Sequence, residues 1–202
     1  MEGLKLFGRW DFEGVEVQDK ALAKYIDIQP IFVPHTHGRH SKKQFAKSRI
    51  NVVERLINRM MRSGQGTRKV AGKFIRGEGA MGKKQTTVNI IREAFEIIEQ
   101  RTKKNPVQVL VDAVSKSGPR EETTTIIYGG IRYHQAVDVS SQRRVDFALK
   151  YLSLGAFAVA FNSKKSTAEC LADEIIWAAA ADQKSYAIQR KDETERIAQS
   201  SR

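Results

Sequence analysis

The sequence predicts a mainly α-helical fold, with six helices and one β-hairpin inserted between the third and fourth helices. Two observations carry this prediction. Apolar residues recur at i, i+3, i+4 and i+7 in several segments between residues 48 and 199, which is the period of amphipathic helices. Between residues 123 and 137 the period changes to two on either side of Gly129-Gly130. That pattern is typical of two strands joined by a two-residue turn.

Residues 1–40 are predicted to form an N-terminal extension with little regular structure, and residues 41–202 the helical domain. Apolar residues in the extension lack a clear period, and Pro30 and Pro34 interrupt its one extended run. At most one short strand is expected there.

The first helix is predicted over residues 48–62, with Arg55, Arg59 and Arg62 on the face opposite its apolar stripe. A loop rich in Gly, Lys and Arg follows over residues 63–84. The second helix is predicted over residues 86–102.

Capping residues delimit the later elements. Asn105 and Pro106 begin the third helix, which Ser117-Gly118-Pro119 ends. The hairpin is predicted at about residues 120–138, and Ser140 or Ser141 caps the fourth helix. A capping box from Ser166 to Glu169 opens the fifth helix, and the sixth covers about residues 185–199.

Charge is distributed unevenly along the chain. The net charge is +12, and residues 35–84 alone hold 14 Lys and Arg against 2 acidic residues. Such concentration favours a polyanionic partner, and charge alone does not separate RNA from DNA. A membrane surface is an alternative, but the apolar face of helix 48–62 lacks Trp and Phe.

Three further features bear on the class of protein. No apolar run reaches the roughly 20 residues that cross a bilayer. The first residues lack the pattern of a signal peptide. The single cysteine, Cys170, excludes an intramolecular disulfide, which fits a reducing cytoplasm.

Residues 77–84 nearly match the phosphate-binding loop of nucleotide-binding enzymes. Lys84, however, stands where that motif needs Ser or Thr, and the flanking pattern is not strand–loop–helix. The preferred interpretation is that the glycines let a basic loop approach phosphates closely. An enzyme that binds ATP is the alternative.

Histidines do not build a convincing catalytic or metal site. His35, His37 and His40 cluster, but no Cys, Asp or Glu lies between residues 28 and 53 to complete a metal site. His134, the remaining histidine, has no nucleophile in a recognisable pattern. We therefore predict no metal, no cofactor and no enzymatic activity.

Two surfaces interleave cations with aromatic rings. The fourth helix carries Arg143, Arg144, Phe147, Lys150 and Tyr151 opposite its core stripe. Such rings can stack on bases while the cations pair with phosphates. Burial of the two rings against another helix is the alternative.

The hairpin is the second such surface, with Arg120, Arg132, His134, Tyr128 and Tyr133. It is predicted to be an arm that reaches into RNA. A hairpin folded back onto its own helices is the alternative.

Several consecutive stretches together resemble the small-subunit ribosomal protein seven family, in its archaeal and eukaryotic form. The resemblance covers roughly residues 40–202 and is carried by Asn105–Val111, Ser117–Glu121, Gln135–Ser140, Arg143–Val145, Thr167–Glu174 and Ser185–Ile188. It implies a structural constituent of the small ribosomal subunit, located in cytoplasmic ribosomes. It also implies binding to the 3′ domain of small-subunit ribosomal RNA, early in assembly of the subunit head, beside neighbouring ribosomal proteins.

The resemblance also implies a position near the exit-site transfer RNA and messenger RNA, for which Tyr128, Gly129, Gly130 and Tyr133 at the hairpin are the candidates. Together with the charge pattern, it gives as candidate contacts to ribosomal RNA the residues Arg39, Lys42, Lys43, Lys47, Arg49, Arg55, Arg59, Arg62, Arg68, Lys69, Lys73, Arg76, Lys83, Lys84, Arg120, Arg132, Arg143, Arg144 and Lys150.

Overall fold

A computed structural model describes residues 3–38, 40–63, 69–70, 73–74 and 83–202. The helices are α1 (Val52–Met60), α2 (Lys84–Thr102), α3 (Pro106–Ser117), α4 (Ser141–Ala160), α5 (Thr167–Ala180) and α6 (Tyr186–Ser200). Strands β3 (Glu121–Tyr128) and β4 (Ile131–Asp138) form an antiparallel hairpin between α3 and α4. The predicted fold class is confirmed.

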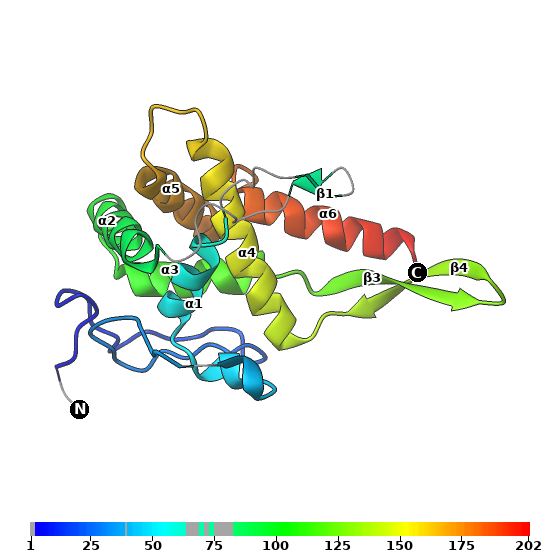
Figure 1. Cartoon of the computed structure of the whole chain (residues 1–202), viewed down its shortest axis with the longest axis horizontal. Coiled ribbons are helices and arrows are strands. Elements are labelled where there is room, and N and C mark those ends of the chain that lie inside the picture. Colours follow the sequence, from blue (N-terminus) through cyan, green and yellow to red (C-terminus); the bar gives the residue numbers. More distant parts are fainter. Residues whose placement is uncertain (1–2, 39, 64–68, 71–72, 75–82) are drawn as a thin grey trace.

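Helix α5 is central to the helical body. It packs against α2, α3 and α4, and its Leu171 and Ile175 are fully buried. Helix α4 crosses the middle of the molecule, while α2 and α5 lie at the end of the body away from the hairpin (Figure 1). This packing buries the apolar stripes that predicted the helices.

The first helix is shorter than predicted. Residues Ala46–Arg49 form a separate 3-10 helix, η2, and α1 begins only at Val52. The Asn51 side chain accepts a hydrogen bond from the amide of Val53 at 2.9 Å, which caps the helix at this point. The backbone of Asp27 also helps to set the start of α1, because its carbonyl oxygen accepts a hydrogen bond from the Val52 amide.

The N-terminal segment, residues 3–38, contributes to the hydrophobic core although it consists of turns and isolated bridges. Leu6 and Leu22 are fully buried and Trp10 is 4% exposed. The Trp10 indole packs edge-on against Phe95 of α2 and donates to Glu99 Oε2 at 3.0 Å. The segment runs as a long coil along the side of the body formed by α1 and α3 (Figure 1).

The hairpin projects from the helical body as an arm (Figure 1). Gly129 and Gly130 at its turn have φ of 57° and 83°, the positive values that a tight type I′ turn requires. The base lies against α6, where Arg202 pairs with Glu121 and Glu195 accepts from the Arg120 amide. The distal part is exposed, so the folded-back alternative does not hold.

Candidate nucleic-acid interface

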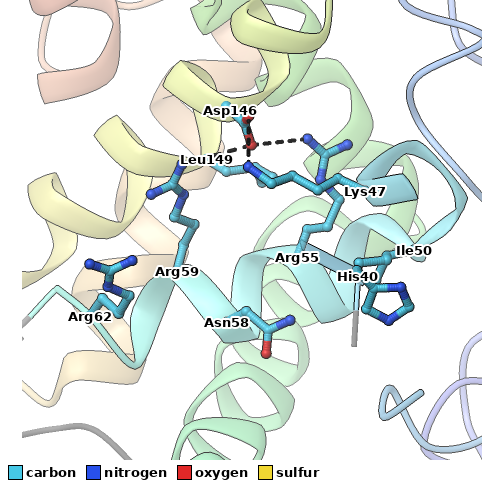
Figure 2. Close-up of a pocket in the computed structure, with 9 residues that line it drawn as sticks. All are labelled: His40, Lys47, Ile50, Arg55, Asn58, Arg59, Arg62, Asp146 and Leu149. Carbon is cyan, nitrogen blue, oxygen red and sulfur yellow. Dashed lines mark hydrogen bonds and ion pairs between the residues drawn. The ribbon is translucent and has the colours of Figure 1, made fainter. Parts of the chain in front are cut away.

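Four predicted RNA-binding residues between positions 47 and 62 line one pocket, together with Asp146 and Leu149 of α4. It encloses about 290 Å³ between η2, α1 and α4. Figure 2 shows its lining, which consists of His40, Lys47, Ile50, Arg55, Asn58, Arg59, Arg62, Asp146 and Leu149. Four of these side chains are Lys or Arg and one is acidic, so the pocket carries a net positive charge.

Asp146 of α4 lies at the centre of the cationic groups (Figure 2). Its carboxylate is 3.2 Å from Arg55 Nη2, 3.5 Å from Lys47 Nζ and 3.7 Å from Arg59 Nη2. The helical period brings Arg55 and Arg59 to the same side of α1, toward α4. One carboxylate therefore holds three cations in one place.

Arg55 differs from its neighbours in being buried. Its side chain is 5% exposed, and Nη1 donates to the Tyr25 carbonyl at 2.8 Å. Burial lowers the pKa of the Arg55 guanidinium, and the Asp146 carboxylate opposes that shift. The sequence pattern placed Arg55 on an open face, but the N-terminal segment and α4 cover it.

Arg144 is buried too, and its guanidinium pairs with Asp19 of the N-terminal segment at 3.1 Å. Arg143, the adjacent residue, has a side chain that is 55% exposed. Of the two arginines at the start of α4, only Arg143 is exposed, and its guanidinium pairs with Glu122 of β3 at 2.8 Å.

Most of the remaining candidate contacts are accessible. The exposed ones are Lys42, Lys43, Lys47, Arg49, Arg62, Lys83, Arg120, Arg132, Arg143 and Lys150, while Arg59 and Lys84 are half-buried. Arg39, Arg68 and Arg76 lie outside the described residues, as do the side chains of Lys69 and Lys73. Residues Lys69–Val70 (β1) and Lys73–Phe74 (β2) pair as a short antiparallel ladder within the predicted loop.

The aromatic rings of α4 are half-buried and stack on one another. The Phe147 and Tyr151 centroids are 5.7 Å apart, and the Arg143 guanidinium lies 4.5 Å from the Phe147 centroid. Tyr151 also lines a groove between α4 and α6 together with Tyr186 and Arg190. The arrangement combines the two alternatives, because each ring packs against the protein and keeps part of its surface open.

Lys84 does not stand free as a phosphate-binding lysine would. Its ammonium lies 2.9 Å from Glu54 Oε1, and the same oxygen accepts from the Thr36 amide and hydroxyl. The glycine motif at residues 77–82 lies outside the described residues. Among the described side chains, no group of three His, Cys, Asp or Glu could hold a metal ion.

Sequence reasoning missed Asn58 and Asp146 as parts of the pocket. Asp146 was the one acid in the basic first half of the fourth helix, but its partners lie 87 to 99 residues away in sequence. A single chain offers no local signal for such contacts.

None of the described helices combines the length and apolar character needed to span a membrane.

A family model described as ribosomal protein S7p/S5e matches residues 22–202. The chain is 53% identical over 200 residues to the small ribosomal subunit protein uS7 of Methanococcus maripaludis strain C7, covering 98% of this chain and 99% of that protein. It is 50% identical, with the same coverage, to the protein of that name from Methanococcus aeolicus.

The helical body, the hairpin arm and the basic pocket agree with that match. A family of structural ribosomal constituents also accounts for a chain whose charge is concentrated and which shows no catalytic pattern in its sequence. We conclude that the chain belongs to the ribosomal protein S7p/S5e family, whose members are structural constituents of the small ribosomal subunit in the cytoplasm and not enzymes.

Proposed function

We propose that this chain binds the 3′ domain of small-subunit ribosomal RNA, initiates assembly of the subunit head, and holds its hairpin near the exit-site transfer RNA and messenger RNA. The observation that carries the proposal is the convergence of Lys47, Arg55, Arg59 and Arg62 on one pocket of a ribosomal protein. Cations gathered in this way, together with the exposed cations around the pocket, neutralise phosphates of one folded RNA and release their counterions.

Salt dependence tests the electrostatic part of the proposal. Six to eight of the ten exposed candidate cations would each neutralise one phosphate. The logarithm of the affinity should then fall with the logarithm of salt concentration with a slope of about −4 to −7. The assay is filter binding of the full chain to a transcript of the 3′ domain. A slope near zero would refute it.

Specificity needs separate controls, because charge alone binds any polyanion. Transcripts of the 3′ domain and of another domain of the same RNA should be compared at one salt concentration, with duplex DNA as competitor. The proposal expects the 3′ domain to bind at least tenfold tighter than either. Equal affinities would show a general polyanion binder.

The hairpin tip offers stacking more than charge. Residues Ile126–Ile131 contain no Lys or Arg, and Tyr128 is 79% exposed. Aromatic rings can stack on unpaired bases of any sequence, typically contributing about 1–3 kcal/mol per base. Tyr128→Ala should weaken exit-site transfer RNA binding in reconstituted subunits without changing 3′-domain affinity. Tyr133→Ala, farther from the turn, should have the smaller effect.

A further inference from the structure

We propose that Asp146 competes with one RNA backbone phosphate for Lys47 and Arg59, so that the pocket between η2, α1 and α4 binds a single phosphate against a built-in carboxylate. The inference rests on the proposed RNA-binding function and names one contact within it. The competition would act on specificity, because a phosphate must be well placed to draw cations away from an acid that already holds them.

The three cations are not held equally by Asp146. Arg55 donates to Asp146 Oδ1 at 3.2 Å, an ordinary hydrogen bond. Lys47 at 3.5 Å is at the limit for such a bond, and Arg59 at 3.7 Å is beyond it. Lys47 and Arg59 thus retain most of their capacity to donate to another oxyanion.

Burial separates the same groups. The Arg55 side chain is 5% exposed, and its second terminal nitrogen, Nη1, donates to the Tyr25 carbonyl. The side chains of Lys47 and Arg59 are 57% and 33% exposed and open toward the pocket. Arg55 is therefore the permanent partner of Asp146, and the other two are the exchangeable ones.

The pocket has charge and space for a phosphate. Lys47, Arg55, Arg59 and Arg62 oppose one carboxylate, which leaves three unit charges uncompensated within the lining. Its 290 Å³ equals roughly ten water volumes of about 30 Å³ each, enough for a phosphate and part of its ribose. The Asn58 amide in the lining can both donate to and accept from a sugar hydroxyl.

Neutralising Asp146 tests the proposal, because competition and support predict opposite signs. Asp146→Asn should bind the 3′-domain transcript about 3- to 10-fold tighter at 0.1 M salt, with a steeper salt slope. The matched control is Asp173→Asn in α5. Asp173 pairs with two cations, Arg101 and Lys165, where Asp146 pairs with three, and its substitution raises the net charge equally. It should stay within about twofold of the parent chain.

A second pair of variants tests the same proposal without removing the carboxylate that pairs with the buried Arg55, whose loss could unfold the chain. Lys47→Gln should bind about 3- to 10-fold more weakly, with a shallower salt slope. Lys165→Gln is its control, since that side chain is also 57% exposed and lies 3.6 Å from an aspartate. In a chain carrying Lys47→Gln and Arg59→Gln, the gain from Asp146→Asn should disappear.

The outcomes separate this inference from the proposed function. If the parent chain fails to bind the transcript, the proposed function is wrong. If it binds but folded Asp146→Asn matches Asp173→Asn, or binds more weakly than the parent, Asp146 does not compete with phosphate. Equal affinities of Lys47→Gln and Lys165→Gln would overturn the phosphate pocket on their own.

Discussion

Replacing Trp10 by Ala tests whether the irregular N-terminal segment is part of the cooperative fold. The Trp10 side chain is 4% exposed, packs edge-on against Phe95 with centroids 5.6 Å apart, and donates to Glu99 at 3.0 Å. Truncating a buried Trp to Ala removes its transfer free energy and leaves a cavity, which costs about 3–5 kcal/mol. Domains are stable by only about 5–15 kcal/mol, so the loss is a large fraction of the total.

The assay is thermal unfolding followed by far-ultraviolet circular dichroism, which reports the helices and not the irregular segment itself. For a chain of this size, 3–5 kcal/mol corresponds to a Tm lower by roughly 6–20 °C. Trp10→Phe keeps a ring in the core but loses the bond to Glu99, so it should cost about 1 kcal/mol plus part of the packing loss. Leu4→Ala is the control, because Leu4 is 41% exposed and should change stability by less than about 0.5 kcal/mol.

An unchanged helix unfolding midpoint in Trp10→Ala would refute the reasoning. It would mean that the helical domain folds independently of residues 3–38 and that the contacts of Trp10 contribute nothing to cooperativity. A separate early transition would mean the same.

Burial raises the pKa of Glu54, but hydrogen bonds from Lys84 and Thr36 together lower that pKa below the ordinary value of 4.5. The Glu54 carboxylate therefore contributes its full stabilisation above pH 4.5, and this stabilisation is lost as the pH falls through the lowered pKa. Acid titration of unfolding should show Glu54→Gln losing stability at pH 7 and converging on the parent chain at low pH; parallel curves would contradict this. Gly130→Ala, at φ 83°, should cost about 1–2 kcal/mol locally and speed amide exchange in the hairpin, with α5 unaffected; unchanged hairpin protection would argue against a strained turn. Arg143→Ala should weaken RNA binding at unchanged Tm, whereas Arg144→Ala should lower Tm, because only the first is exposed; equal effects in both assays would show that burial does not separate them.

Local signals predicted most of the secondary structure. The third helix and its Asn105 cap appear where expected, with the cap oxygen accepting from the Val107 amide at 3.0 Å. Ser166 caps the fifth helix through the Glu169 amide, and the glycine pair forms the hairpin turn. Each of these features depends on residues within four positions of one another, so a single sequence contains the information.

The first helix shows where local reasoning failed. Its apolar period continues through residues 48–62, yet Asn51 and the backbone of Asp27 divide the segment into η2 and α1. The choice between a start at Asn51 and a longer helix depended on Asp27, which lies 25 residues before Val52. The sequence also shows apolar residues in the N-terminal extension, but it does not show that the helical body buries them.

The sequence alone determined the helices, the hairpin, the concentration of positive charge in residues 35–84 and the family. Only the tertiary structure decided which cations face solvent. The side chains of Arg55 and Arg144 are buried and paired with aspartates. Those of Arg59 and Arg143 remain accessible. Helical period fixes the direction of a side chain relative to its own axis. Contacts between residues about a hundred positions apart decide whether another segment covers that face. The same contacts decide whether an acidic side chain such as Asp146 lies against the cation.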